Sequence, residues 1–464
     1  MEGEERDETF AGARAFAEGG DWERVRAILA HWTVLDLIDF MEEMRDLDGA
    51  ALLRSIPKER AAEVLAHLDP GHQERILDGL PDAESRAIMA DLSPDERTAI
   101  LGMLPAGSAR RLLGLLSPED QAEARGLLSY PEESVGRLMT PDYVAIRPEW
   151  TLAQVLAYVR RHGQDSETVS RVYVVDAAGV LLDDIRLRQV ILGDPEQTVA
   201  SLMNRDFPFL RPTDDREVAV REMQRKGVYA LPVVGPGGRL LGIVTADDVL
   251  AVAQKEATED IQKMGAVEAL GTPYLETPFW TMVRKRAGWL AILFVGEMLT
   301  ASAMGAFQDE LGKVLVLALF IPLIISSGGN SGSQASTLVI RALSLGELKL
   351  RDWWRVVRRE LLGGLVLGVV LATIGIGRIL LWQGIFPGYY GGLAAQVSVV
   401  VGLSLVGVVM WGTLSGSLLP LLLRRLGFDP ASASAPLVAT LVDVSGLVIY
   451  FGIAKLVFAA QLAA

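Results

Sequence analysis

The feature that most constrains this chain is an acidic residue in the middle of an apolar run near its carboxyl end. Asp443 lies within ASASAPLVATLVDVSGLVIYFG, residues 431–452, and apolar residues continue to Ala464. The run is long enough to cross the ~30 Å hydrocarbon core of a membrane as a helix. A carboxylate at that depth costs about 2.5 to 3.5 kcal/mol and is tolerated where it faces a bundle interior, a partner or water. Asp443 is therefore predicted to be an ion or proton site; the alternative is a buried carboxyl hydrogen-bonded to a neighbouring helix.

Charge is distributed unevenly along the chain. With 464 residues, two or more domains are expected. From Trp280 onward there are 14 Lys and Arg against 8 Asp and Glu, whereas the part before it has 30 against 50, a net charge of −20. An acidic soluble part and a membrane part with basic edges are predicted. Such an acidic surface excludes nucleic acid as a partner and suits cations. The absence of cysteine excludes disulfides and thiolate metal sites.

Prolines recur regularly in the first 130 residues. They stand at positions 57, 70, 81, 94, 105 and 118, so that spacings of 13 and 11 residues alternate. This pattern predicts a repeated helix pair with a proline near each helix start, in an all-α, solenoid-like domain. Ser93 and Ser117 are typical N-caps, and first-turn acids such as Asp95 complement the helix dipole. This helix-terminal role is the alternative to any ligand role for Asp95.

An internal duplication follows from Leu138. Each copy reads as an extended run, an amphipathic helix, two strands joined by a glycine turn and a second helix. The start LMTP and the end GIVTADD resemble those of a tandem pair of CBS domains, an α/β fold. Because CBS pairs commonly sense adenine nucleotides, the resemblance suggests ATP as a ligand. The segment from Thr245 to Asp248 is either a cap of the next helix or part of a ligand or metal site.

A long acidic helix is predicted from Val249 to Leu270. Glu256, Glu259 and Asp260 stand three to four residues apart on it, and like charges at that spacing repel by a few tenths of a kcal/mol per pair. An ordinary solvated helix tolerates such repulsion. Beside an acidic domain, however, bound divalent cations would favour its packing, and carboxylate oxygens are the ligands that Mg²⁺ prefers.

Five apolar segments are predicted to span the membrane. They run over residues 287–307, 314–343, 361–382, 394–423 and 432–463. If the number of spans is five, the basic residues that flank them all lie on the same side of the membrane. These residues are Arg284, Lys285, Arg286, Arg341, Lys349, Arg351, Arg355, Arg358, Arg359, Arg424 and Arg425. This side is predicted to be cytoplasmic. The first residues, MEGEERDE, lack an apolar signal segment, which agrees with cytoplasmic N-terminal domains and an external C-terminus.

Small polar residues interrupt two of these segments. Residues 325–334 read ISSGGNSGSQ in the second span, and Gly412, Thr413, Ser415, Gly416 and Ser417 form a similar row in the fourth. Such residues occur in membranes where the backbone lines water or where helices pack closely. We expect both rows to converge with Asp443 on a path through the bundle, lined by Gly329, Asn330 and Ala439; close packing alone is the alternative.

The whole chain resembles the MgtE family of bacterial magnesium channel-transporters, which are not enzymes. The motifs are PLIISSGGNSGSQASTLVIRAL, EATEDIQKMG and DPASASAPLVATLVDVSGLVIYF. The resemblance implies a multidomain membrane protein: an acidic helical N domain (1–130), tandem CBS domains (131–252), a connecting plug helix (253–280) and a five-helix pore domain (281–464). It also implies a homodimer in the cell (inner) membrane with a pore between the subunits.

The same resemblance implies specific metal ligands. Asp443 of each chain would face a hydrated Mg²⁺, and Asp429 at the cytoplasmic mouth would share ions with Asp260. Regulatory Mg²⁺ would use Glu63, Asp95, Glu217, Asp248, Glu256 and Glu259. The chain departs from the family pattern at Ser333, Ala435 and Thr413, and has Gly227 and Ala251 where carboxylates can complete a regulatory site.

Two other functions are considered. One is a CBS-regulated transporter of another divalent cation or of a solute. The other is an intramembrane aspartyl hydrolase using Asp443 and Asp429, but these residues are fourteen apart in the chain, ~20 Å along a helix, too far for a dyad within one chain.

Overall fold

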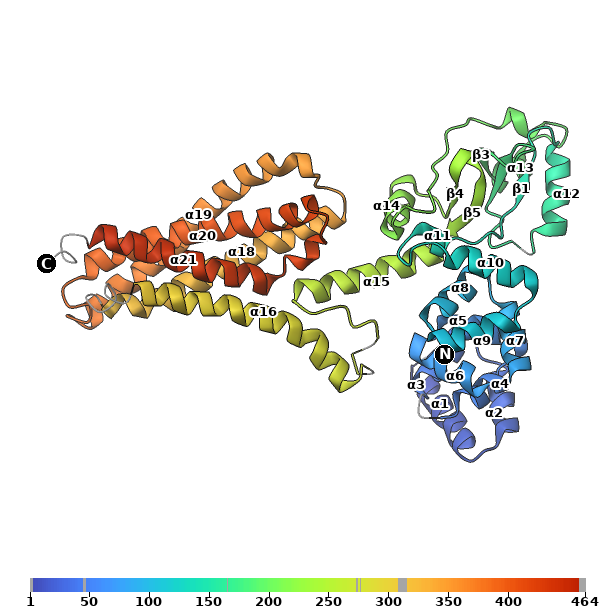
Figure 1. Ribbon diagram of the computed structural model, residues 1–464, viewed down its shortest axis with the longest axis horizontal. Helices are drawn as coiled ribbons and strands as arrows, with labels where there is room; N and C mark the ends of the chain where they lie inside the picture. The colour runs from blue at the N-terminus through green and yellow to red at the C-terminus, as the bar shows by residue number, and fades with distance from the viewer. Residues whose placement is uncertain are drawn as a thin grey trace. The chain divides into compact units, whose positions relative to one another are not determined.

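The computed structural model describes residues 3–44, 47–164, 166–272, 274–275, 277–307 and 315–458, without the side chains of residues 3–7. The chain forms two compact units, Met1–Gln254 and Lys255–Ala464 (Figure 1). The division falls within one long helix, α15 (Ala246–Met264), so that its first turns belong to the first unit and its last turns to the second.

The first part of unit one is a stack of short helices (Figure 1). They are α1 (Gly3–Glu18), α2 (Trp22–Leu29), α3 (Val34–Glu43), α4 (Gly49–Ser55), α5 (Lys58–His67), α6 (Pro70–Gly79), α7 (Asp82–Asp91), α8 (Pro94–Met103), α9 (Ala106–Leu115) and α10 (Pro118–Leu128). The helical repeat predicted from the proline spacing is confirmed. Pro70, Pro94 and Pro118 occupy the first helical position, whereas Pro57, Pro81 and Pro105 are N-caps. A proline suits a helix start because its missing N–H would have no partner there.

Two CBS repeats follow in the same unit. The first contains α11 (Val135–Leu138), β1 (Ala145–Ile146), α12 (Leu152–His162), β2 (Arg171–Val175), β3 (Leu181–Arg186) and α13 (Leu187–Leu192). The second contains η1 (Val199–Ser201), α14 (Arg216–Lys226), β4 (Ala230–Val234), η2 (Pro236–Gly238), β5 (Leu240–Thr245) and the start of α15.

The two repeats have equivalent sheets. In the first, β1 runs parallel to β2, and β2 pairs antiparallel with β3. In the second, β4 pairs antiparallel with β5, and Leu210 forms a parallel bridge to Val233 in the place that β1 has in the first copy. The α/β duplication predicted from the sequence is therefore present.

The helix α15 ends at Met264, earlier than the predicted Leu270. Ala266 adopts a φ of 57°, the left-handed conformation that terminates helices, and the Val267 amide donates to the carbonyl of Gln262. The Gln262 side chain then accepts from the Leu270 amide at 2.8 Å. Residues 265–272 are consequently not helical, and the connecting helix is shorter than predicted.

Unit two contains five helices that are long and apolar enough to cross a membrane. Its elements are α16 (Phe279–Ala306), η3 (Leu315–Phe320), α18 (Ile321–Ser344), η4 (Leu350–Asp352), α19 (Trp353–Ile385), α20 (Ala394–Arg425), η5 (Pro430–Ser432) and α21 (Ala435–Val457). The five predicted spans are present, with different ends. The third begins at Trp353 rather than Leu361, and the fifth at Ala435, after the N-cap Ser434.

The small residues of the fourth span pack helices rather than line a path, so that part of the prediction is wrong. A Cβ atom at Gly416 would lie 2.0 Å from the Gly332 carbonyl oxygen, and one at Gly412 would lie 2.3 Å from that of Gly328. Only glycine permits such an approach of α20 to α18. The Thr413 hydroxyl is buried and donates to the carbonyls of Glu360 and Met410.

Candidate cation sites

A cavity of about 430 Å³ lies between three membrane-length helices of unit two. Its lining residues belong to α16 (Glu297, Thr300, Met304), α18 (Ile321, Pro322, Ile325, Ser326, Gly329, Asn330, Ser333) and α21 (Ala439, Asp443, Leu447). No basic side chain and no residue of α20 belongs to this described lining. The cavity therefore combines apolar walls with two carboxyl groups and several neutral oxygen atoms.

The structure places the predicted path residues Gly329, Asn330, Ala439 and Asp443 together in this cavity. A Cβ atom at Gly329 would lie 3.8 Å from a carboxylate oxygen of Asp443 and 3.5 Å from the Cβ of Ala439. Glycine thus keeps space open beside the carboxylate. The segment 325–334 is regular helix throughout, so its small residues open the cavity through their size and not through a break in α18.

Two polar side chains of α18 that line the cavity form hydrogen bonds within the bundle. The Asn330 amide donates to the Ser326 hydroxyl at 3.4 Å, one turn earlier on the same helix. The Ser333 hydroxyl donates to the Ala435 carbonyl at 3.1 Å and so ties α18 to the start of α21. Ser333 therefore joins the two helices that carry most of the cavity.

Glu297 in the first span was missed by the sequence analysis, which treated Asp443 as the acid in mid-span. The Glu297 carboxyl lies within hydrogen-bonding reach of that of Asp443. The signal was available, because Glu297 interrupts the apolar run LAILFVGEMLTASAM. An acid at membrane depth is by itself a reason to expect a functional site.

A second acidic group lies where the last turns of α15 meet the membrane helices of unit two. Lys263 forms ion pairs with Glu259 at 3.0 Å and with Asp429 at 2.7 Å, and Asp260 accepts from the Ser344 hydroxyl at 3.0 Å. We call these four residues, Glu259, Asp260, Lys263 and Asp429, the plug group. The structure brings together three of the predicted ligands and adds a lysine that the sequence analysis did not consider.

The pKa shifts in the plug group have clear causes. Burial raises the pKa of the Asp260 carboxyl; the hydrogen bond from Ser344 opposes this, and Asp429 adds to it. Burial would lower the pKa of the Lys263 ammonium, but the hydrogen bonds to Asp429 and Glu259 outweigh it and raise that pKa. Lys263 is therefore charged at neutral pH and supplies positive charge to the group.

A third acidic group lies within unit one, between α8 and the start of α15. Asp95 is 7% exposed, and one of its carboxyl oxygens has no hydrogen-bond partner among the described residues. Burial raises its pKa to about 6, and burial followed by the charge of Asp95 raises that of Asp248 to about 8. Glu167 is exposed over part of its surface, but the burial of the rest, followed by the charge of Asp95, raises the pKa of its carboxyl to about 7. We call Asp95, Glu167, Asp247 and Asp248 the sensor group.

Helix-terminal contacts, the alternative to ligand roles in this group, are present at the starts of both α8 and α15. Ser93 forms a capping box with Glu96, whose side chain accepts from the Ser93 amide at 3.1 Å. Asp95 is a first-turn acid of α8, yet its burial against other acids exceeds what a helix terminus requires. Thr245 donates to the Asp248 carboxylate at 3.0 Å at the start of α15.

The remaining predicted ligands lie elsewhere. Glu63 is exposed on α5, Glu256 is half-buried on α15, and Glu217 forms an ion pair with Arg221 at 2.9 Å within α14. Gly227 ends α14 with a φ of 62°, a left-handed conformation that a carboxylate residue would adopt only with strain. Ala251 is exposed on α15.

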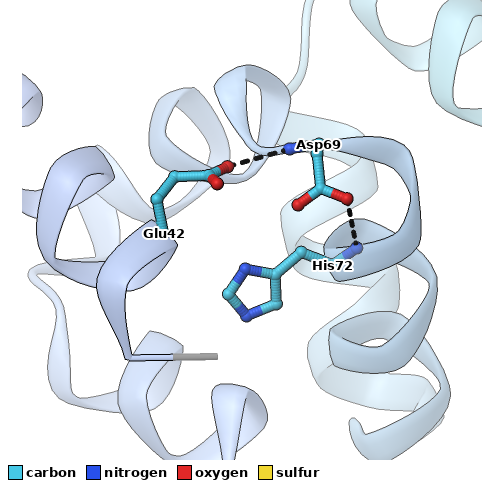
Figure 2. Close-up of side chains that lie close together, drawn as sticks. All are labelled: Glu42, Asp69 and His72. Carbon is cyan, nitrogen blue, oxygen red and sulfur yellow. Dashed lines mark hydrogen bonds between the residues drawn. The ribbon is translucent and has the colours of Figure 1, made fainter. Parts of the chain in front are cut away.

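A cluster that the sequence analysis did not identify lies in the helical repeat. Glu42, Asp69 and the buried His72 have potential ligand atoms within 4.8 Å of one another (Figure 2). The Glu42 carboxylate accepts from the Asp69 amide at 3.0 Å, and the Asp69 carboxylate accepts from the His72 amide (Figure 2). The same Asp69 oxygen also accepts from the Gly71 amide. These bonds cap α6 and join it to α3, which explains both carboxylates by their structural role.

A helical repeat, a CBS pair and five membrane-length helices, three of which line an acidic cavity, define a multi-span membrane protein with CBS domains. Comparisons with known proteins identify it more closely. Residues 321–453 match the MgtE model of divalent cation transporters, residues 32–133 the MgtE intracellular N domain, and residues 135–191 and 199–255 the CBS domain.

Two magnesium transporters agree with this chain over most of its length. The magnesium transporter MgtE of Thermus thermophilus is 40% identical over 444 residues, covering 95% of this chain and 96% of the relative. That of Bacillus subtilis is 33% identical and covers 71% of this chain and 70% of its own. A crystal structure of the cytosolic domain of the Mg²⁺ channel MgtE in complex with ATP is 38% identical, with a TM-score of 0.50, over 52% of this chain and 99% of that one. The chain therefore belongs to the MgtE family, and the predicted family and fold class are confirmed.

Proposed function

We propose that this protein transports Mg²⁺ across a membrane and that Asp443 binds the ion during transport. The observation that carries the proposal is the cavity between α16, α18 and α21, with the Asp443 carboxylate beside the small residues Gly329 and Ala439. The magnesium transporters of Thermus thermophilus and Bacillus subtilis are relatives over most of their length.

The cavity suits an ion that retains part of its hydration shell. Mg²⁺ dehydrates reluctantly and keeps several waters when it is bound by one or two carboxylates. The space beside Asp443 and the neutral oxygens of Ser326, Asn330 and Ser333 provide acceptors for such waters. Binding through water also keeps the affinity low enough for release, as conduction requires.

We propose a homodimer in the cell (inner) membrane, in which Asp443 of both chains faces one pore. The proposal rests on the family resemblance. The basic residues that flank the spans support an orientation with the soluble domains in the cytoplasm and the C-terminus outside. The intracellular N domain of the family agrees with this orientation.

Cytosolic Mg²⁺ is proposed to close the protein through the sensor group and the plug group. In the sensor group, burial and mutual repulsion make ionised carboxylates unfavourable without a counterion. Mg²⁺ would neutralise them and stabilise the closed arrangement, and its greater affinity for that state would shift the equilibrium. Glu63, Glu217 and Glu256 are proposed as further regulatory ligands on the family resemblance.

ATP is proposed as a ligand of the CBS pair. The support is the ATP complex of the cytosolic domain of an MgtE channel that is 38% identical to this chain. Isothermal titration of ATP into the purified protein, with and without Mg²⁺, measures this directly.

The transport proposal is tested by the substitution Asp443→Asn, which removes the charge and preserves the size. In liposomes loaded with a Mg²⁺-sensitive dye, we expect Mg²⁺ flux to fall at least about tenfold, because the ion loses the only carboxylate of α21. Glu360→Gln, an acid of α19 outside the described cavity lining, is the matched control and should transport normally. Unchanged flux in Asp443→Asn refutes the proposal.

A further inference from the structure

The helix α16 brings a second carboxyl group to the Asp443 cavity. A Cβ atom at Gly296 would lie 2.6 Å from the side-chain methyl of Thr440 on α21, so a larger residue there would displace the Thr440 side chain. This close approach of the two helices occurs at the residue immediately before Glu297. The Glu297 side chain consequently reaches the cavity and lies within hydrogen-bonding reach of Asp443.

We propose that Glu297 is a second cation-binding carboxylate of the transport site, so that each chain holds the ion with two acids from two helices. The inference rests on the proposed role of Asp443. Two carboxylates that line one cavity repel each other when both are ionised, and a divalent cation between them offsets this repulsion. Within the described lining no lysine, arginine or histidine competes for this role.

The surroundings of Glu297 support a ligand role. Thr300 lies three residues later on α16, lines the same cavity, and has a buried hydroxyl oxygen without a hydrogen-bond partner among the described residues. Residues three apart on a helix share a face, so Glu297 and Thr300 present oxygen atoms to the same space. A buried hydroxyl without a partner costs free energy, which a bound ion or its water would recover.

The second carboxylate should mainly set the affinity. Asp443 alone would attract the ion with one charge per chain, whereas the pair doubles the charge that each chain offers. Glu297→Gln should therefore raise the Mg²⁺ concentration for half-maximal flux about tenfold. The maximal rate should fall by less than about fivefold, because Asp443 still provides the central site.

The test is Mg²⁺ flux into liposomes over a range of Mg²⁺ concentrations, with the full chain and four variants. Glu297→Gln should show the tenfold rise, Glu297→Asp should stay within about threefold of the unmodified chain, and Glu360→Gln should match it. A half-maximal concentration in Glu297→Gln within twofold of the unmodified chain overturns the inference.

Two further outcomes are decisive. If Glu297→Gln carries no flux at any concentration, recovery in Glu297→Asp supports a requirement for charge. Equal inactivity of Glu297→Asp overturns the inference, because side-chain size at the α16–α21 contact then matters and not charge. The Asp443→Asn variant separates the two proposals. If Asp443→Asn loses Mg²⁺ flux while Glu297→Gln has the same half-maximal Mg²⁺ concentration as the unmodified chain, only the role of Glu297 is refuted.

Discussion

The sensor group and the plug group are both acidic, yet they differ in one residue that changes their chemistry. The neighbours that shift the pKa values of Asp95 and Asp248 are other carboxylates and hydroxyls, whereas Lys263 lies between Glu259 and Asp429. The first group therefore needs protons or a cation for neutrality. The second already contains a positive charge.

From this difference we infer that the two ends of α15 have different roles. Asp247 and Asp248 are in the first turn of α15, and Lys263 is in its last turn. Under the proposed gating, a group without its own cation responds most strongly to the concentration of Mg²⁺, because its carboxylates need the ion for neutrality. Under the same proposal, a group with its own cation depends less on the Mg²⁺ concentration for its contact. We infer that the first turn of α15 is the more sensitive to Mg²⁺ and the last turn the less sensitive.

The largest effect is expected from removing a charge from the sensor group. At pH 8, where Asp248 is ionised in about half of the molecules, Asp248→Asn removes part of the repulsion and one carboxylate available to the ion. The protein should therefore stay compact without Mg²⁺, with protease protection that depends at least tenfold less on the ion. Limited proteolysis of the full chain in detergent, from zero to several millimolar Mg²⁺, measures this. Glu149→Gln, an exposed acid of the same unit, is the control. A Mg²⁺ dependence equal to that of the unmodified chain contradicts the sensor assignment.

A smaller effect is expected when the lysine is removed. Lys263→Met leaves Glu259 and Asp429 without a counterion. The plug group then contains carboxylates and no cation, as the sensor group does. Partly exposed pairs contribute up to about 1 kcal/mol, so roughly three- to fivefold more Mg²⁺ should be needed for protection. Lys255→Met changes an exposed lysine of the same helix and should have no effect. If both variants behave alike, the lysine does not distinguish the groups.

The smallest effect is a pH dependence confined to the sensor group. The raised pKa values of Asp95, about 6, and Asp248, about 8, mean that the folded protein retains protons that the unfolded chain has lost. Without divalent cations, this contact is most stable below about pH 4 and loses stability as the pH rises toward 8. At the higher pH, fewer of these carboxyl groups hold a proton, so Mg²⁺ displaces fewer protons when it binds to them.

The corresponding measurement is the Mg²⁺ concentration for half-maximal protease protection at pH 6 and at pH 8. It should fall about two- to threefold at the higher pH in the unmodified chain. Asp248→Asn should remove most of this change, while Lys263→Met should retain it. A pH dependence that persists in Asp248→Asn would assign the titration to other groups.

Much of the fold was predictable because it depends on local patterns. The proline spacing corresponds to the helix starts of the repeat, the glycine turns and apolar alternation to the CBS strands, and the long apolar runs to the five spans. Helix ends were less predictable, since α15 ends through the left-handed conformation of Ala266, a residue without a preference for it.

The candidate site could be predicted from the sequence only in part. Asp443, Asn330 and Gly329 were identified from their residue types, and they do line one cavity. The small residues of the fourth span have the same composition, but Gly412 and Gly416 contact the backbone of α18. A glycine that opens a cavity and one that allows helix packing are identical in the sequence.

By itself, the sequence determined the order of the domains, the number of membrane spans and the acid of the fifth span, because these follow from composition and periodicity. Only the tertiary structure decided which face of each helix borders the cavity. It placed Glu297 beside Asp443 and Lys263 between Glu259 and Asp429. The physical reason is that interactions between charges depend on distances across helix contacts, and those contacts are fixed by packing between residues far apart in the chain.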